Sequence, residues 1–346
     1  MLIGRVVGIC GITALLSVAS PLALAQQTPN LQGQKITVAE FGGALLKYVQ
    51  QAWTVPFEKA SGAKVDIDTP NARAKLKAQV DSGNAVWDVY TEDAAFIQSN
   101  CGVLFEKVDT SKFVSAGIDK RFVTNDCGVP TSIVASVFAY NEDKFGKTPP
   151  KGWVDFFDTK KFPGKRAIWN NPTSGLLEAA LLADGVPADK LYPLDLDRAF
   201  KKLDTIKDLI MWTQSTGGLT DALANNQVDL SLAYAGRAYA AAKTGAKINL
   251  VKDEEIVSWD QYAVVKGSKN KAAAEAFLQF IAQPEQQAKL TELTSYATAN
   301  AKGHPKVDAL TERFLPNQSK AVFTNQGWWS KNFDMVNQRF VAWQSK

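Results

Sequence analysis

One basic residue stands where a strand pattern changes to a helix pattern, in the segment LSLAYAGRAYAAAKTGA at residues 230–246. The apolar run breaks at Gly236, Arg237 follows at once, and an alanine-rich helical pattern begins. A helix N-terminus favours an anion because free N–H groups and the helix dipole point toward it. A guanidinium can hold a carboxylate through two parallel hydrogen bonds. We therefore predict that Arg237 binds a negatively charged group; the alternative is a surface ion pair on the first helical turn.

Residues suited to catalysis are sparse. The one histidine, His304, lies in the polar segment KGHPK, which is typical of an exposed loop. The sequence has no glycine-rich phosphate loop, no histidine pair and no nucleophile elbow, and one histidine makes a zinc site a poor prediction. We predict no enzymatic activity, no cofactor and no metal site. An acid–base pair drawn from the 35 acidic residues stays an alternative.

The first 25 residues have the layout of a secretory signal peptide. Arg5 precedes an apolar segment, and small residues at Ala23 and Ala25 indicate cleavage after Ala25. Glycines and serines interrupt the apolar segment, which is short for a membrane span. We expect residues 1–25 to be removed and the mature chain to be a soluble periplasmic protein. A membrane or lipid anchor at this end is the alternative.

Charge and length limit the partners and the architecture. There are 39 Lys and Arg residues against 35 Asp and Glu residues, and cleavage would remove the basic Arg5. So small an excess gives no reason to expect nucleic acid or an anionic membrane as a partner. The mature part of this 346-residue chain can bury a large core, and its length favours two lobes over one.

Two cysteines remain after the predicted cleavage, Cys101 in SNCGVLF and Cys127 in TNDCGVP. In an oxidising compartment an even number of cysteines close in sequence indicates a disulfide. It would close a loop of about 25 residues and contribute roughly 3 kcal/mol. A reactive thiol is the alternative.

Short apolar runs alternate with helical patterns in the first part of the mature chain. We predict strands at KITVAEF, AKVDID and WDVYTED, and helices at GGALLKYVQQAWTVPFEKASG, ARAKLKAQVDSG and AAFIQSNCG. This order predicts a mostly parallel sheet with helices on its faces. Ligands bind beyond the carboxyl ends of such strands, so residues 41–44 and 91–94 are candidate ligand loops.

Two β-rich segments, VPTSIVASVFAYNEDKF and EEIVSWDQYAVVKG, are long enough to pass from one lobe to the other and back. Between them, NPTSGLLEAALLADG predicts a loop that enters a helix, with Asn171 and Thr173 as possible caps. DLDRAFKKLDTIKDLIMWT has the pattern of an amphipathic helix. We predict that lobe 1 comprises residues 26–137 and 259–305, and lobe 2 residues 138–258 and the C-terminal helices in 306–346.

In their order, several segments resemble the periplasmic solute-binding proteins of ABC importers, and within them the polyamine-type group of the type II fold. The segments are WDVY, CGVLF, VFAYNEDKF, PKGWVDFFDTKKFPGKRAI, LDTIKDLI, AYAGRA, SWDQYAVVKGSKNKAAAEAFLQFIAQPEQQ and SYATAN. The resemblance covers nearly all of the mature chain. It implies a two-lobed α/β fold in which each lobe is a mixed sheet flanked by helices. The lobes would close over a small cationic or zwitterionic ligand in the cleft between them.

The resemblance also implies site residues. The acidic residue that holds the ligand amine matches Asp260 in SWDQY; a structural ion pair is the alternative. Polyamine binders hold the other amine with acidic residues at positions where this chain has Pro172 and Gly175, which carry no charge. The segment AYAGR resembles the Trp-Asn-Gly-Arg loop of relatives that bind 4-aminobutyrate and similar amino acids, with Tyr234 in place of Trp and Ala235 in place of Asn.

We therefore expect Arg237 to hold the carboxylate and Asp260 the ammonium group of one zwitterion. Aromatic faces stabilise nearby cations, and the rings expected around the ligand are those of Tyr234, Trp259 and Phe41. For each ring, ordinary core packing is the alternative.

Backbone N–H groups of two glycine-containing loops and of the Arg237 segment are further expected ligand contacts. Glycine lets a ligand approach the backbone closely, as at Gly236, in EFGG, and in TSG, which contains Ser174. The alternative is that both loops are plain turns.

The sequence thus predicts a monomeric periplasmic protein that binds a 4-aminobutyrate-like zwitterion and delivers it to an ABC permease. A polyamine such as putrescine or spermidine is an alternative ligand. Ferric iron would need clustered tyrosines, whereas Tyr234, Tyr239 and Tyr262 are scattered along the chain. An exported enzyme is the alternative outside the binding-protein class.

Overall fold

The computed structural model describes Met1 and residues 28–346, so the predicted signal peptide and its cleavage site lie outside the described residues. None of the helices in residues 28–346 is both long and apolar enough to cross a bilayer.

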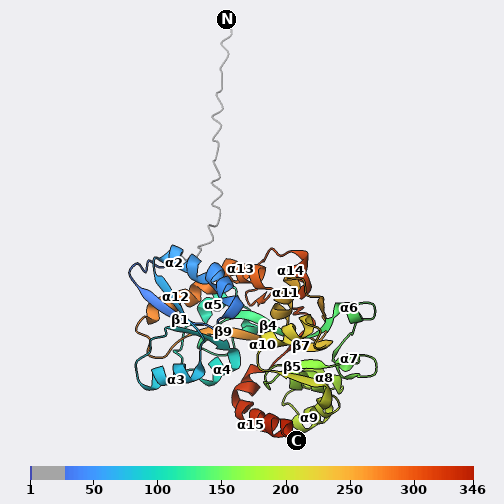
Figure 1. Cartoon of the computed structure of the whole chain (residues 1–346). Coiled ribbons are helices and arrows are strands. Elements are labelled where there is room, and N and C mark those ends of the chain that lie inside the picture. The colour runs from blue at the N-terminus through green and yellow to red at the C-terminus, as the bar shows by residue number, and fades with distance from the viewer. Residues whose placement is uncertain (2–27) are drawn as a thin grey trace.

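A single curled sheet runs through the molecule (Figure 1). Its main path has the order β2-β1-β3-β9-β4-β7-β5-β6, while β8 and β10 pair with β4 and β11 pairs with β9. The strands are β1 (Lys35–Ala39), β2 (Lys64–Asp68), β3 (Val89–Asp93), β4 (Gly128–Asn141), β5 (Arg166–Trp169), β6 (Ile210–Thr213), β7 (Leu230–Tyr234), β8 (Ile248–Leu250), β9 (Ile256–Val264), β10 (Ala297–Thr298) and β11 (Val322–Phe323).

Lobe 1 is built on β1, β2 and β3, which are parallel, as the sequence predicts. Figure 1 shows the helices of this lobe around the sheet on the left of the view. They are α1 (Leu46–Val49), α2 (Val55–Ser61), α3 (Arg73–Asp81), α4 (Ala94–Ser99), α5 (Ser111–Ala116), α12 (Lys271–Ile281) and α13 (Pro284–Thr294).

The first predicted helix forms, but its geometry changes along its length. A 3-10 turn at Gly43–Leu45 leads into α1, a π-helical turn at Gln50–Thr54 follows, and α2 completes the helix. Gly62 ends it with φ 75°, the left-handed conformation that glycine adopts without steric penalty. The buried Trp53 and Phe57 anchor this helix against the core of lobe 1.

Lobe 2 is built on β5, β6 and β7, which are parallel to one another. Its helices are α6 (Glu142–Phe145), α7 (Trp153–Phe157), α8 (Leu176–Ala183), α9 (Leu196–Asp204), α10 (Thr216–Ala224), α11 (Ala235–Lys243), α14 (Ala309–Phe314) and α15 (Gln326–Gln344). Most of its helices lie on the right of Figure 1, with α10 near the middle and α15 at the lower centre.

The amphipathic helix predicted over residues 195–213 is only partly correct. Asp195 accepts a hydrogen bond from the backbone N–H of Arg198 and so caps α9, which ends at Asp204. The remaining residues form a short 3-10 turn and then β6, which pairs with β5 in parallel register. The helix does not continue through Ile210–Thr213, because these residues pair with the edge of β5 instead.

Strands β4 and β9 connect the two lobes. Gly128 to Pro130 at the start of β4 pair with Gln261 to Ala263 in β9, whereas Ser136 to Tyr140 pair with β7 of lobe 2. Strand β9 pairs with β3 of lobe 1 from Asp260 onward. The predicted lobe boundaries at residues 137/138 and 258/259 therefore fall inside these two crossing strands.

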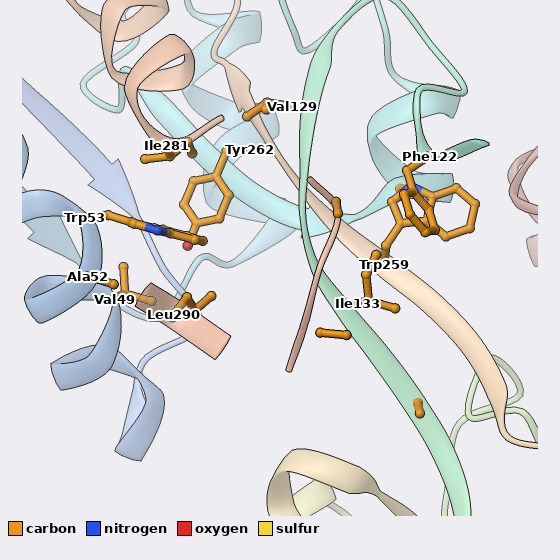
Figure 2. Packing of buried hydrophobic residues seen from close by; sticks show 14 of the residues in the cluster. Val49, Ala52, Trp53, Phe122, Val129, Ile133, Trp259, Tyr262, Ile281 and Leu290 are labelled. Atoms are coloured by element: carbon orange, nitrogen blue, oxygen red, sulfur yellow. The ribbon is translucent and has the colours of Figure 1, made fainter. Parts of the chain in front are cut away.

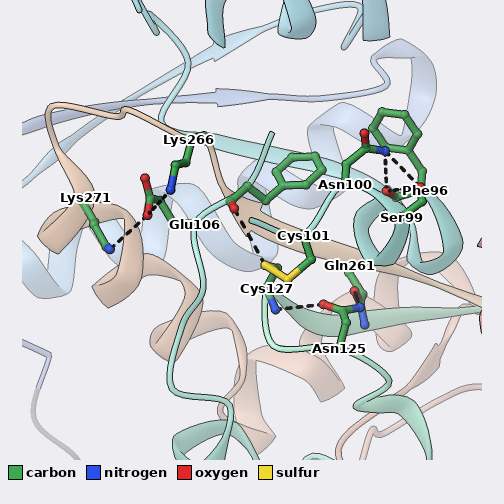
Figure 3. The surroundings of a disulfide bond; sticks show 11 residues. Phe96, Ser99, Asn100, Cys101, Glu106, Asn125, Cys127, Gln261, Lys266 and Lys271 are labelled. Atoms are coloured by element: carbon green, nitrogen blue, oxygen red, sulfur yellow. Dashed lines mark hydrogen bonds and ion pairs between the residues drawn. A yellow bond between two sulfur atoms is a disulfide. The ribbon is translucent and has the colours of Figure 1, made fainter. Parts of the chain in front are cut away.

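The predicted disulfide is present between Cys101 and Cys127, with an S–S distance of 2.00 Å (Figure 3). Cys101 follows α4, and Cys127 precedes β4, so the bond ties a helix of lobe 1 to the beginning of a crossing strand. Asn125 accepts a hydrogen bond from the backbone N–H of Cys127 and donates one to the Gln261 side chain in β9.

Candidate ligand-binding site

Arg237 lies in the first turn of α11, directly after β7 ends at Tyr234. The position before it must be glycine because of a close approach. A Cβ atom on Gly236 would lie 2.5 Å from Cε1 of Tyr296, which is far inside van der Waals contact. Tyr296 belongs to the segment between α13 and β10. The ring of Tyr296 therefore packs on the backbone of the turn that presents Arg237.

The Arg237 side chain is partly buried and has no hydrogen bond or ion pair with any residue in the range 28–346. Its charge acts on Tyr296: burial raises the pKa of the Tyr296 hydroxyl, Arg237 opposes that rise, and Asp260 adds to it. Tyr296 is thus close enough to interact electrostatically with both Arg237 and Asp260. Arg237 and Asp260 do not form an ion pair with each other.

Asp260 lies in β9 directly opposite Asp93 of β3. Within the described part of the chain its carboxylate has neither a hydrogen bond nor an ion pair. Burial raises the pKa of Asp260 well above its usual value, and the negative charges of Glu92, Asp93 and Glu40 raise it further. A bound cation would reverse this effect, because an opposite charge favours the ionised carboxylate.

Glu40 is a buried acid at the carboxyl end of β1. Burial raises the pKa of Glu40 to about 7, although a hydrogen bond donated by the Tyr262 hydroxyl opposes the shift. Figure 2 shows Tyr262 beside Trp53, with ring centroids 5.3 Å apart. Tyr262 therefore links Glu40 to a packed aromatic pair.

Tyr234 ends β7 opposite Ser136 of β4, so the two side chains share one face of the sheet. Its ring packs edge-on against Trp169, with centroids 6.2 Å apart. Burial raises the pKa of the Tyr234 hydroxyl, and the charge of Asp260 adds to the rise. Tyr234 consequently lies near Asp260 and close to the Arg237 turn.

The loop before α8 also reaches this region. Gly175 has φ 84°, and a Cβ atom there would lie 3.0 Å from Cβ of Ser136, the residue opposite Tyr234. The hydroxyl of Ser174 is buried and has no hydrogen-bond partner among the described residues. The N-cap position of α8 is Gly175 rather than Asn171 or Thr173, because Asn171 instead accepts hydrogen bonds from the backbone N–H and hydroxyl of Thr173.

Trp259 and Phe41 differ from the other predicted residues. Trp259 is only 4% exposed and packs edge-on against Phe122 at 5.3 Å, apart from Tyr262 and Trp53 in Figure 2. Adjacent residues of a strand point to opposite faces, so Trp259 turns away from the face of Asp260. Phe41 follows Glu40 at the end of β1 and is 40% exposed.

No group of three or more His, Cys, Asp or Glu side chains in residues 28–346 has an arrangement suited to a metal ion. Two of the acids near Asp260, Glu92 and Asp93, instead form ion pairs with Arg73.

Several residues near the two unpaired charges were not among the predicted site residues, namely Tyr296, Glu40, Glu92, Asp93 and Arg73. A signal existed for three of them, because Glu92 and Asp93 lie in the candidate loop at residues 91–94 and Glu40 begins the EFGG loop. Tyr296 lies in SYATAN, one of the segments that carry the family resemblance, but nothing in that segment marked it as a site residue.

Comparison with known proteins identifies the family. A family model for bacterial extracellular solute-binding proteins matches residues 52–311. The chain is 35% identical over 329 residues to the gamma-aminobutyric acid-binding protein of Pseudomonas aeruginosa, covering 91% of this chain and 92% of the relative. It is 26% identical over 279 residues to the putrescine-binding periplasmic protein SpuD of Pseudomonas aeruginosa, covering 72% and 75% of the two chains.

Solved structures give the same result for the fold. The structure of the Atu4243-GABA receptor matches with a TM-score of 0.83 at 35% identity, covering 90% of this chain and 98% of that one. An ABC transporter substrate-binding protein from Bradyrhizobium japonicum matches with a TM-score of 0.84 at 34% identity, covering 90% and 99%. The two-lobed α/β architecture is thus that of the type II periplasmic binding proteins, and the chain belongs to the family of bacterial extracellular solute-binding proteins.

Proposed function

We propose that this protein is the periplasmic binding component of an ABC importer and captures a small zwitterionic amino acid such as 4-aminobutyrate. The observation that carries the proposal is a pair of opposite charges, Arg237 and Asp260, that have no partner among residues 28–346 and lie close to Tyr296. Partly buried charges without partners are unfavourable in a ligand-free protein. A ligand that carries one charge of each sign removes both penalties at once.

The chemistry of each end fits this ligand. Arg237 would hold the carboxylate through its planar guanidinium, at the N-terminal turn of α11 where backbone N–H groups add to the attraction. Asp260 would hold the ammonium group, and Tyr234 and Tyr296 would cover the methylene groups between the two ends. Truncating either charged side chain should weaken binding by roughly 2–5 kcal/mol, which is about thirtyfold or more.

Similarity to named relatives supports this choice of ligand. The relative with 35% identity over most of both chains is a gamma-aminobutyric acid-binding protein, whereas the putrescine-binding relative is 26% identical. In the proposed cycle the chain acts after cleavage of residues 1–25, as a monomer without enzymatic activity. Closure of the lobes on the ligand presents a surface that the membrane permease distinguishes from the open form.

The test is calorimetric titration of protein that has been unfolded and refolded to remove any retained ligand. We expect 4-aminobutyrate to bind the wild type, and Arg237→Gln and Asp260→Asn each to weaken binding at least about thirtyfold. Arg339→Gln is the matched control, because Arg339 is a half-exposed arginine of α15 that pairs with the exposed Asp197. Equal binding by wild type and Arg237→Gln would contradict the proposal.

Putrescine is the second candidate, and one observation favours it. Glu40, Glu92 and Asp93 all act on Asp260, so the cation-binding side has more acidic groups than one ammonium group requires. If putrescine binds the wild type and no ω-amino acid does, the polyamine assignment replaces the zwitterion.

A further inference from the structure

The acidic groups around Asp260 raise a problem of charge balance. Asp93 lies directly opposite Asp260 in the antiparallel pair of β3 and β9, and Glu92 precedes it. Like charges directly opposite each other on one face of a sheet are destabilising. Each also adds negative potential where a ligand ammonium group would lie, and such potential favours a dication over a zwitterion.

Arg73 compensates for two of these charges. It is the first residue of α3, and its Nε donates to Oε2 of Glu92 at 3.0 Å while its Nη2 donates to Oδ2 of Asp93 at 2.8 Å. The guanidinium lies 4.2 Å from the ring centroid of Phe96 in α4, which fixes its plane. One side chain of lobe 1 thus bridges two carboxylates next to Asp260.

The remaining acids differ in how they are satisfied. Glu40 accepts a hydrogen bond from the Tyr262 hydroxyl and is buried, and its pKa near 7 makes it partly neutral at neutral pH. Asp260 has no such partner within residues 28–346. The other groups that face Asp260 are the hydroxyls of Tyr234, Tyr262 and Tyr296.

We propose that Arg73 sets the charge selectivity of the cation-binding side of the site. By pairing with Glu92 and Asp93 it leaves the carboxylate of Asp260 to face the ligand, so that a zwitterion with one ammonium group is bound in preference to a diamine. This inference rests on the proposed function, and Arg73 acts through the carboxylates rather than by touching the ligand. It is therefore a positioning residue that determines specificity.

The first test is the ratio of the dissociation constants of 4-aminobutyrate and putrescine, measured by calorimetry at pH 7.5. Arg73→Gln should shift this ratio toward putrescine by about tenfold, the effect of about one additional close charge pair. The shift is no larger because the Arg73 and Asp93 side chains are 44% and 42% exposed and water screens part of their interaction.

Lys75→Gln is the matched control. Lys75 lies in the same helix, pairs with Asp68 at 2.6 Å and lies 4.7 Å from the ring centroid of Trp87, but none of its partners is an acid that acts on Asp260. It should leave the ratio unchanged. An equal shift in Lys75→Gln and Arg73→Gln would overturn the assignment, because any lost charge in α3 would then suffice.

A second variant, Glu92→Gln, should change the ratio of dissociation constants in the opposite direction. Glu92→Gln removes one of the two negative charges that pair with Arg73, so the net charge of Arg73, residue 92 and Asp93 rises from −1 to zero and the ratio should move away from putrescine. This variant also decides the question if Arg73→Gln does not fold. The proposal is wrong if a folded Arg73→Gln leaves the ratio unchanged, or if Glu92→Gln moves the ratio toward putrescine.

A readout that needs no ligand separates this proposal from the proposed function. The pKa of Asp260, followed by the carboxyl carbon signal of ligand-free protein in NMR, should rise in Arg73→Gln, fall in Glu92→Gln and stay the same in Lys75→Gln. If the wild type binds neither ω-amino acids nor putrescine, the proposed function fails, while the pKa of Asp260 in these three variants still tests the charge role of Arg73. If the ligands bind as proposed and the shifts do not appear, the role of Arg73 fails alone.

Discussion

Two arginines of lobe 2 differ in burial and in how many hydrogen bonds their guanidinium groups donate. Arg166, at the start of β5, is fully buried and directs all three guanidinium nitrogens at backbone carbonyls. Nε donates to Phe156 at 3.1 Å, Nη2 to Phe162 at 2.6 Å, and Nη1 to Gly164. Arg237 is partly buried and has no hydrogen bond or ion pair within residues 28–346.

The carboxyl groups show the same difference. Glu178 in α8 is buried, and its Oε1 accepts hydrogen bonds from the Tyr192 hydroxyl at 2.6 Å and from Nε1 of Trp329 at 2.9 Å. Asp260 accepts no such hydrogen bond from any described residue and faces other acids instead. Hydrogen bonds to Glu178 thus join α8 to α15 within lobe 2, whereas the two charges without partners among residues 28–346 lie where the crossing strands meet the strand ends.

The largest expected effect is on folding, at Arg166. Arg166→Met leaves buried carbonyls without donors and should lower the free energy of unfolding by about 3–5 kcal/mol. Arg237→Met should change it by less than about 1 kcal/mol, because no hydrogen bond or ion pair to residues 28–346 is lost. Urea unfolding of the two ligand-free variants checks this, and similar losses in both would remove the distinction between the two arginines.

The second-largest expected effect is the contribution of Glu40 to the pH dependence of the free energy of unfolding. Its pKa in the folded protein is about 7, above the value of 4.5 for an unperturbed glutamate, so the folded state binds more protons between these values. Its contribution to stability is therefore complete below about pH 4.5 and is lost as the pH rises through 7, by at most about 3 kcal/mol.

Glu40→Gln provides the measurement, because it keeps an acceptor for Tyr262 and removes the charge. We expect it to match the wild type at pH 5 and to exceed it in urea midpoint at pH 8. If the variant were equally destabilised at both pH values, the pKa of Glu40 would not be raised in the folded protein.

A smaller and less usual effect is expected at Asp260. Because its ionised form is unfavourable without ligand, Asp260→Asn should stabilise the ligand-free protein at pH 7.5 by about 1 kcal/mol while it abolishes tight binding. Asp253→Asn is the control, since Asp253 is an exposed partner of Lys320. Destabilisation by Asp260→Asn would mean that the carboxylate has a structural partner.

The smallest effect is expected for Glu178→Gln, which removes the ionisable group of Glu178 and keeps an acceptor oxygen. Burial raises its pKa, which favours the neutral acid, so Glu178→Gln should change the free energy of unfolding by less than about 1 kcal/mol. Glu178→Ala removes the acceptor of two buried donors and should cost about 2–4 kcal/mol. Comparing the thermal midpoints of the two variants checks this, and equal losses would show that the hydrogen bonds of Glu178 contribute little.

The sequence was sufficient for local features with short-range causes. The first three strands and helices, the crossing segments, the disulfide and the turn that carries Arg237 follow from apolar periodicity, cysteine spacing and glycine placement. The strand at Ile210–Thr213 could not be predicted from local pattern, because these four residues form a strand by pairing with β5.

The surroundings of the candidate site depend on contacts between distant segments. Tyr296 packs on Gly236 from 60 positions along the chain, and Arg73 meets Glu92 from another strand–helix unit. No local pattern encodes such contacts. The expected contact of both Trp259 and Asp260 with one ligand conflicts with strand geometry, since neighbouring strand residues face opposite sides of a sheet.

The most direct test of the two-charge site is a crystal structure of the protein with 4-aminobutyrate bound. We expect the carboxylate to accept two hydrogen bonds from the guanidinium of Arg237 and the ammonium group to donate to Asp260, with the rings of Tyr234 and Tyr296 against the methylene groups. A ligand bound in the reverse orientation, or an Arg237 that pairs with a carboxylate of the protein, would contradict the account.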